Sequence, residues 1–326
     1  MTNSVRLSTI SDQAAVRLLE DLPNELFYDL FPYLEVRQLY RSFFGLNHRL
    51  DTLLYGLKKN YLVMSDVNDT FDETSVYASR ITHMWIRQEY SNLSFHCFRN
   101  TIRAMSLDGL SHQQFQQLDQ LTNLTHLKIN SLNMRRSLIL VSLRPRRYIE
   151  TLSELLNLIT HPLRSLSSVT IPLCIRDDFC RVLVVAPNLF RLNVNVFRIN
   201  SSISDKKLVP HHNLRSLNIQ WYIGVNHSDL DFYLSQVPFL QSLHLSVRLC
   251  TMPDSEFLYE LLHQMSLSIR RHLPSLRRFS CSFRINFVSL NVVFDPNRLD
   301  AIFTRAIRIK QSGCQLKMLS KWAMVR

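Results

Sequence analysis

The sequence predicts an α/β protein in which a short N-terminal helical module precedes a curved solenoid with a parallel sheet on its concave face. Two observations lead to this prediction: a wide amphipathic pattern confined to the start of the chain, and a short apolar phrase that recurs through most of the rest. Charge separates the same two parts. The 326 residues carry a net charge of +12, but residues 1–75 hold seven Lys and Arg against eleven Asp and Glu, a balance of −4, and the remainder carries +16.

The helical module is predicted over residues 14–60, after a polar and flexible N-terminus at residues 1–13. Pro23 suits the first turn of a helix because its missing N–H would be unpaired there anyway. Glu25 is favoured at the positive end of the helix dipole. We therefore expect a helix to begin near residue 22 and to bend or end at Pro32.

Apolar residues of this module form a stripe that is wide for one helix. They recur every three or four residues at Leu22, Leu26, Phe27, Leu30, Phe31 and Leu34. A second amphipathic run follows and includes Leu39 and Phe43. Two or three short helices carry more apolar side chains here than so small a unit can bury, so part of the stripe is left for a partner.

Four groups of residues in this segment stand in a characteristic order: Leu22-Pro23-x-Glu25-Leu26, Leu30-Phe31-x-Tyr33-Leu34, Leu39 with Phe43, and Asn47-His48-Arg49-Leu50. This arrangement resembles the F-box, a small helical module that docks on the Skp-type adaptor of a cullin-containing ubiquitin ligase. The resemblance implies the adaptor and the cullin ligase core as partners. It implies adaptor contacts at Leu22, Pro23, Glu25, Leu26, Leu30, Phe31, Leu34, Leu39 and Phe43. The alternative is an ordinary helical hairpin that caps the rest of the chain.

Residues 61–76 are predicted to be an acidic connector, and residues 77–326 to be built of repeats. The repeated phrase has apolar residues at its first, fourth and sixth positions. Its eight copies begin at Ile81, Ile102, Leu124, Leu166, Leu189, Leu214, Leu240 and Leu276. Most starts are 21 to 26 residues apart, within the range of leucine-rich repeats. One interval of 42 residues could hide a further copy near Ser137 to Leu143, and one of 36 indicates a longer helix.

Helical patterns lie between the phrases, and Pro187, Pro238 and Pro274 close three of them. The patterns span Ser111 to Leu121, Tyr148 to Thr160, Asp177 to Val185, Ser228 to Val237, Ser255 to Leu273, and Asn297 to Ile309. A strand and a helix per repeat, stacked side by side, give a curved solenoid with parallel strands on its inner wall. Most of the chain thus resembles F-box proteins with irregular leucine-rich repeats. The alternative is a set of unrelated strands in an α/β sheet.

The sequence lacks the motifs of catalysis, and we expect a non-catalytic subunit with no cofactor and no metal. Five glycines are too few for a phosphate-binding loop. The six cysteines are widely spaced and are predicted to be reduced. His211 and His212 are interpreted as part of a solvated turn, and Asp177 and Asp178 as a solvated first turn of a helix.

No apolar run is long enough to span a bilayer, so we expect a cytoplasmic or nuclear protein without a membrane partner. The excess of cations could indicate nucleic acid. Its densest groups are Arg144, Arg146 and Arg147, and Arg270, Arg271, Arg277 and Arg278. Because these lie at predicted turns and helix ends, we interpret them as structural and do not expect nucleic acid as a partner.

Residues between and just after the apolar positions of each phrase should face the inner wall. They are His83, Trp85, Arg87, His126, Lys128, Asn130, Arg191, Asn193, Asn195, Ser216, Asn218, Gln220, Tyr222, Ser242, His244, Ser246, Arg278, Ser280 and Ser282. The substrate-binding candidates among them are Trp85, Arg87, Lys128, Arg191, Asn193, Tyr222, His244 and Arg278. We expect Arg87, Arg191, Tyr222 and Arg278 to grip an acidic or phosphorylated segment. Alternatively, this wall is only solvated and partners use loops.

The leading functional hypothesis is a substrate-recognition subunit of an Skp/cullin/F-box ubiquitin ligase, with repeats that bind an unknown protein substrate. The other is a leucine-rich-repeat scaffold or nucleic-acid-associated protein without a ubiquitin-ligase role, in which the helices only cap the repeats.

Overall fold

The computed structural model describes residues 21–65, 71, 74–87, 94–108, 115–130, 156–174, 176–196, 209–221, 227–249 and 255–285. It is an α/β structure with one open sheet of nine strands. Every neighbouring pair of strands is parallel, and the order across the sheet follows the order in the chain. The strands are β1 (Tyr61–Met64), β2 (His83–Ile86), β3 (Ala104–Leu107), β4 (His126–Ile129), β5 (Ser168–Cys174), β6 (Arg191–Val196), β7 (Ser216–Trp221), β8 (Ser242–Leu249) and β9 (Arg278–Ile285).

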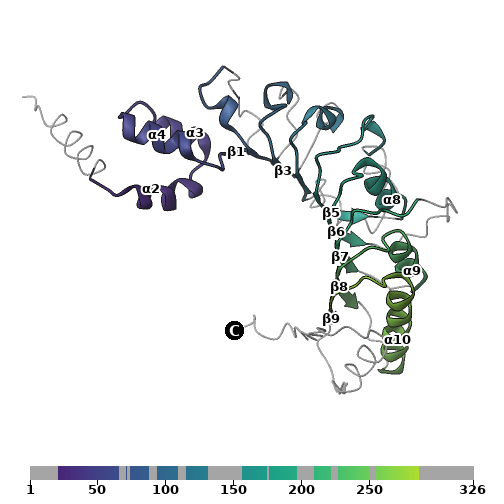
Figure 1. Ribbon diagram of the computed structural model, residues 1–326. Coiled ribbons are helices and arrows are strands. Elements are labelled where there is room, and N and C mark those ends of the chain that lie inside the picture. Colours follow the sequence, from purple (N-terminus) through teal and green to yellow (C-terminus); the bar gives the residue numbers. More distant parts are fainter. Residues whose placement is uncertain are drawn as a thin grey trace, which may run out of the picture.

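A group of short helices precedes the sheet, and further helices lie between its strands. The first group comprises α2 (Asn24–Leu30), the 3₁₀-helix η1 (Phe31–Tyr33), α3 (Val36–Phe43) and α4 (His48–Gly56). The later ones are η2 (Ala78–Arg80), η3 (His96–Phe98), η4 (Gln117–Gln120), α8 (Arg176–Val185), α9 (His227–Ser235) and α10 (Ser255–His272). Figure 1 shows the sheet as an arc, with α8, α9 and α10 on its outer side and the first helices beside β1.

The repeated phrase explains why these segments form strands and which of their side chains are buried. In β6, for example, Leu189, Leu192 and Val194 occupy the three apolar positions of the phrase and all are buried. Side chains alternate between the two faces of a strand, so each phrase places one row in the core and the other on the open face. All eight predicted phrases form strands, β2 to β9.

The sequence prediction missed β1, which lies inside the range assigned to the acidic connector. Because Tyr61 pairs with His83, Lys59 is in the position of Ile81, which is the first apolar position of the next copy of the phrase. The copy that forms β1 thus begins with a cation where the other copies have an apolar residue. The suggested extra copy near Ser137 to Leu143 lies outside the described residues, and the sheet holds no strand between β4 and β5. These two strands pair directly, and the N–H groups of Ser167 and Ser168 both donate to Thr125 O.

The helical predictions held where the chain is long enough between strands. Helices α8, α9 and α10 match the predicted segments to within two residues, and α10 accounts for the interval of 36 residues. In the predicted segment Ser111 to Leu121, the described part is helical: Phe115 and Gln116 are α-helical and η4 follows them, while residues 111–114 lie outside the described residues. The segment at Asn297 to Ile309 and most of the one at Tyr148 to Thr160 lie outside the described residues, as does the arginine group at 144–147.

One continuous apolar core joins the N-terminal helices to the sheet and to the helices outside it. Large side chains such as Phe98, Phe179 and Trp221 are fully buried in it. Among the described residues, no helix is long and apolar enough to cross a membrane.

Candidate functional site

Helix α2 divides its apolar residues between two faces. It begins at Asn24, with Pro23 as an extended N-cap, slightly later than the predicted start at residue 22. Leu26 and Leu30 are four residues apart and share one face, and Leu22 precedes them. Their exposed fractions are 38% for Leu22, 50% for Leu26 and 46% for Leu30. The structure thus leaves a leucine face open to solvent, which we call the α2 leucine face.

The opposite side of α2 builds the core of the helical module. Phe27 and Phe31 are buried, and their rings lie 5.4 Å apart, with Phe43 within 6.3 Å of both. Arg49 of α4 fixes the start of α2, since its Nε donates to Asn24 Oδ1 at 2.8 Å and its guanidinium lies over the Phe27 ring. The leucine face is therefore held on a packed support.

Burial separates the predicted adaptor contacts into two sets. Phe31 and Leu39 are buried and cannot touch a partner, which corrects their assignment as contacts. Leu34 and Phe43 are half-buried against the core. Exposed members are Leu22, Pro23, Glu25, Leu26 and Leu30. The prediction missed other exposed apolar side chains of the module, namely Tyr28, Tyr33, Phe44, Leu46 and Tyr55. The helical periodicity of the sequence identified the apolar residues of the module. It could not show which of them are buried, because that depends on how the helices pack against one another.

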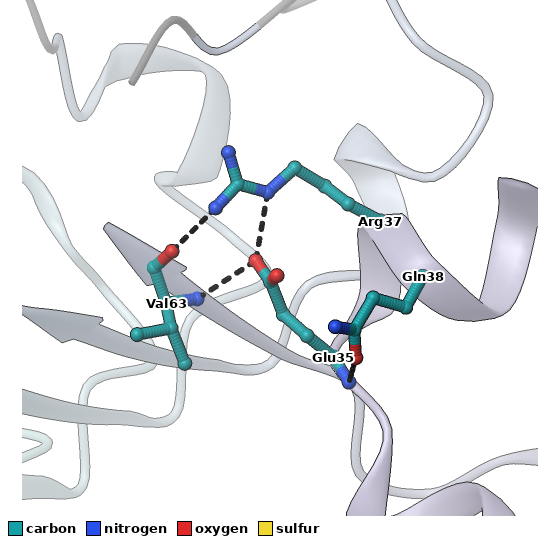
Figure 2. Close-up of polar contacts among 4 residues, drawn as sticks. All are labelled: Glu35, Arg37, Gln38 and Val63. Atoms are coloured by element: carbon teal, nitrogen blue, oxygen red, sulfur yellow. Dashed lines mark hydrogen bonds and ion pairs between the residues drawn. The ribbon is translucent and has the colours of Figure 1, made fainter. Parts of the chain in front are cut away.

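A polar junction attaches the module to the edge of the sheet (Figure 2). Glu35 caps α3 and accepts hydrogen bonds through Oε1 from Val63 N at 3.1 Å and from Arg37 Nε at 2.8 Å. Arg37 in turn donates to Val63 O at 2.5 Å. Val63 lies in β1, the first strand of the sheet. Two side chains of the module thus satisfy both backbone groups of an edge residue, which would otherwise be open to another strand.

The predicted inner-wall residues do occupy the open face of the sheet. Burial alternates along β4 and β6, with His126 and Lys128 exposed and Arg191 exposed. Trp85, Arg87 and Arg278 are exposed as well, and Asn193 and His244 are half-buried. Ser246 is an exception because it is buried. Tyr222 lies outside the described residues.

The arginines expected to grip an acidic segment lie far apart on the sheet. Arg87 follows β2, whereas Arg191 begins β6 and Arg278 begins β9. Seven strand spacings of about 4.8 Å separate β2 from β9, roughly 34 Å measured along the sheet. Only an extended segment could reach all three, because periodicity gives the face of a residue but not its distance from another.

Trp85, Arg87 and Lys128 do share one hollow, at the start of the sheet. It has a volume of about 790 Å³ and extends from Pro32 of the module across β1 to β5. Lys59 and His126 also line it. We call this the β1–β4 hollow. The sequence could not indicate Lys59, because it belongs to the strand that was missed.

The side chains of this hollow are held by local contacts. The Arg87 guanidinium stacks on Trp85, 4.1 Å from the ring centroid. The Trp85 indole N–H donates to Asp108 Oδ2 at 3.0 Å. Burial lowers the pKa of His83, and the nearby Lys59, His126 and Arg103 lower it further. His83 is thus favoured in its neutral form by a surrounding positive field.

Other predicted polar features are structural. His211 is buried, not in a solvated turn: Leu214 N–H donates to its Nδ1 at 3.1 Å, and its Nε2 donates to Ala186 O at 3.1 Å. Asp177 is solvated in the first turn of α8, as expected, but Asp178 is buried. Within the described ranges no group of His, Cys, Asp and Glu could hold a metal ion. Cys97, Cys180 and Cys281 are not in disulfide bonds.

The fold and these surfaces define an α/β protein with an open parallel sheet. No family model matches the chain. Likewise, no curated protein matches its sequence.

Proposed function

We propose that this chain is the substrate-recognition subunit of an Skp/cullin/F-box ubiquitin ligase. The helical module would be an F-box that docks on the Skp-type adaptor. The nine strands and their connections would be an irregular leucine-rich-repeat solenoid that binds the protein substrate. Ubiquitin transfer itself would be carried out by the other subunits, with this chain supplying proximity.

The observation that carries this proposal is the α2 leucine face. Leu22, Leu26 and Leu30 are exposed, although the module beneath them has a packed aromatic core. The exposed surface of these leucines adds no stability to the module, which buries its phenylalanines instead. Exposed apolar side chains that are grouped in this way favour a protein partner. They are also the residues that carry the resemblance to the F-box.

The test is binding of the purified full-length chain to an immobilised Skp-type adaptor. The triple variant Leu22→Ala, Leu26→Ala, Leu30→Ala should bind at least about 30-fold more weakly, since truncation at a hot spot costs about 2 kcal/mol or more. A matched control removes three apolar side chains that are exposed elsewhere: Val184 at 63%, Phe190 at 51% and Leu267 at 38%. Their triple Ala variant should bind as the wild type does.

A second function has its own supporting observation. The contacts from Glu35 and Arg37 to Val63 place the module as a cap on β1, as a scaffold whose helices only protect the sheet would require. The two functions differ in what the leucine variant changes. A cap that uses these leucines predicts a lower melting temperature and no adaptor binding by any form of the chain. An F-box predicts an unchanged melting temperature and lost adaptor binding.

A further inference from the structure

The β1–β4 hollow contains three cations that have no acidic partner among the residues the structure describes: Lys59, Arg87 and Lys128. Some cations elsewhere in the described residues do have a carboxylate partner. Arg37 contacts Glu35 at 2.8 Å, Arg176 contacts Asp229, and Arg271 lies 3.5 Å from Asp231. No carboxylate lines the hollow within the described part of the chain. Among the described residues, no carboxylate in the lining compensates its charge.

The shape of the hollow follows from the strand register. Ala104 of β3 lies between His83 and His126, and Ser106 lies between Trp85 and Lys128. Small side chains on the middle strand and large ones on both sides make a trough with cationic walls. Pro32, from the helical module, closes one end of it.

The cation at its rim is oriented in advance. Trp85 is fixed by its hydrogen bond to Asp108, and the Arg87 guanidinium lies over the indole ring. Stacking occupies the face of a guanidinium but leaves its N–H edge free, and this edge is the one that binds two oxygens of a phosphate at once. Less side-chain entropy is lost on binding when the group is already in place.

In the row of the sheet that contains Lys128, the described cation lies in the first strands, while the neighbouring row carries two widely separated arginines, Arg191 and Arg278. Past Lys128 the same row of the sheet continues through Thr170, Asn193, Asn218, His244 and Ser280. In this row Asn193 donates to Thr170 Oγ1, and His244 bonds Ser280. Four strands span only about 15 Å. The cationic patch has the size of one or two phosphate groups, whereas a nucleic-acid strand needs a track of cations along its backbone.

We propose that the β1–β4 hollow binds a phosphorylated segment of a protein, with Arg87, Lys128 and Lys59 as the groups that contact phosphate. This inference rests on the proposed function, since it names the substrate class of the same subunit. It moves the expected recognition site away from Arg191 and Arg278. The neighbouring Trp85 and the neutral row beyond β4 would contact the residues that flank the phosphate.

The experiment measures binding of the purified full-length chain to two libraries of fluorescent nine-residue peptides. One library has a fixed central phosphoserine and the other has serine there, with all other positions degenerate. We expect the phosphoserine library to bind at least about tenfold more tightly, because charge-assisted bonds to a guanidinium are strong. The variant Lys59→Ala, Arg87→Ala, Lys128→Ala should lose that tenfold preference. The control variant Arg164→Ala, Arg191→Ala, Arg278→Ala removes the same charge from exposed positions outside the hollow and should keep it.

Four results would overturn the inference. The libraries could bind equally, or the control variant could lose as much affinity as the hollow variant, which would indicate general electrostatic attraction. Inorganic phosphate could displace the phosphoserine library at the library's own concentration, which would indicate a site for a small ion. A twelve-nucleotide poly(U) RNA could bind more tightly and displace the peptides, which would indicate nucleic acid.

Adaptor binding of the same variants separates this inference from the proposed function. The hollow variant should bind the Skp-type adaptor and melt as the wild type does, because none of its three residues belongs to the α2 leucine face. Loss of peptide preference with adaptor binding retained places the phosphate contacts in the hollow. A chain that binds the adaptor but shows no preference in its wild-type form refutes this inference alone. A chain that binds phosphoserine peptides but no adaptor refutes the proposed function alone.

Discussion

The two halves of the sheet use the same strand pattern but differ in what connects the strands. In the first half, β1 to β4, Tyr61 pairs with His83 and His83 with Ala104, so one repeat takes 22 or 21 residues. In the second half, β5 to β9, the repeats take 23, 25, 26 and 36 residues, as the pairing of Ser168, Arg191, Ser216, Ser242 and Arg278 in successive strands shows. The described connections of the first half contain 3₁₀-helices, and those of the second contain α8, α9 and α10.

Repeat length accounts for part of this difference. A 3₁₀-turn needs three or four residues, whereas an α-helix needs several turns to bury an apolar face. The 36-residue repeat has room for α10, but the 23-residue repeat between β5 and β6 already holds the ten residues of α8, so the sequence of the connection matters as well as its length. An α-helix is also about 10 Å wide, which is twice the spacing between strands. The helices therefore take up more room than the strands, so the sheet curves with its strands on the concave side and the helices on the convex side. The comparison shows that the same repeated strand pattern can be combined with 3₁₀-helices or with α-helices on the outer side of the sheet. Each strand depends mainly on the two neighbouring strands for its hydrogen bonds.

The largest effect is expected from Trp221→Ala in the second half. Trp221 of β7 is fully buried and packs on Tyr233 of α9, with ring centroids 5.9 Å apart. Loss of so large a core side chain should cost about 3–5 kcal/mol of unfolding free energy. Since strands pair only with their neighbours, hydrogen exchange should rise first in β6, β7, β8 and α9.

A matched variant in the first half is Phe98→Ala. Phe98 is also fully buried, in η3, and its ring lies 4.9 Å from that of Phe71. It should raise exchange in β2, β3 and β4 and leave β7 and β8 protected. Exchange that rises equally over all nine strands in either variant would show that the two halves unfold as one unit.

A smaller effect is expected at the junction between the module and β1. Glu35→Ala removes the acceptor for Val63 N–H and the partner of Arg37, which should cost about 1–3 kcal/mol. Denaturant unfolding would measure this cost, and exchange at the Val63 amide would report it locally. The control Glu25→Ala removes an exposed carboxylate of α2 and should leave both unchanged. Equal losses in the two variants would mean that the junction contributes nothing of its own.

Much of this fold could be predicted because its signal is periodic. The phrase fixed the face of residues such as Leu192 and Arg191, and eight of nine strands followed. Strand β1 was missed because Lys59 breaks the phrase, although the burial of Leu62 and Met64 follows the same rule. Periodicity is a pattern of residues that are close in sequence. It does not identify a strand in which a polar residue occupies the first position of the phrase, where an apolar residue is expected.

The candidate sites were less predictable for the same reason. Leu30 ends α2 and Phe31 begins η1, and only the packing of α3 and α4 decides that Phe31 is buried and Leu30 exposed. Likewise, Lys128 joins Lys59 and Arg87 only because β1, β2 and β4 lie in one sheet. Which cations are left without a carboxylate is a property of the folded chain. The number of charged residues can be read from the sequence, but the ion pairs between them cannot.

Acid should weaken the second half of the sheet through His211. Burial lowers its pKa below the usual 6.5, the bond to Ala186 O opposes this, and His212 and Arg215 lower it further. Because the unfolded chain takes up a proton more readily, the contribution of His211 to stability is complete above about pH 6.5 and is lost as the pH falls below it. Protonation would also abolish the bond that Nδ1 accepts from Leu214 N–H.

Chemical denaturation at pH 7.5 and at pH 5.5 would measure this effect. The wild type should lose stability at the lower pH, and His211→Gln should lose less, since glutamine does not titrate. His161→Gln is the control, because His161 is exposed, and it should keep the wild-type dependence. A wild-type dependence in His211→Gln would assign the acid sensitivity to other groups.

The smallest effect compares the two halves without altering stability, through the reactivity of their cysteines. Burial raises the pKa of Cys180 to about 12, and Asp177 raises it as well. At pH 8 only about one Cys180 side chain in ten thousand would be a thiolate, which is the reactive form. Cys281 is also buried, whereas Cys97, in η3, is half-exposed. Brief treatment of the native chain with iodoacetamide, followed by peptide mass spectrometry, should therefore modify Cys97 before the other two. Denaturant should make all three react alike, which controls for the chemistry of each peptide. If Cys180 were modified as fast as Cys97 in the native chain, α8 would open as readily as the 3₁₀-turns, and the longer repeats would confer no extra protection on the second half.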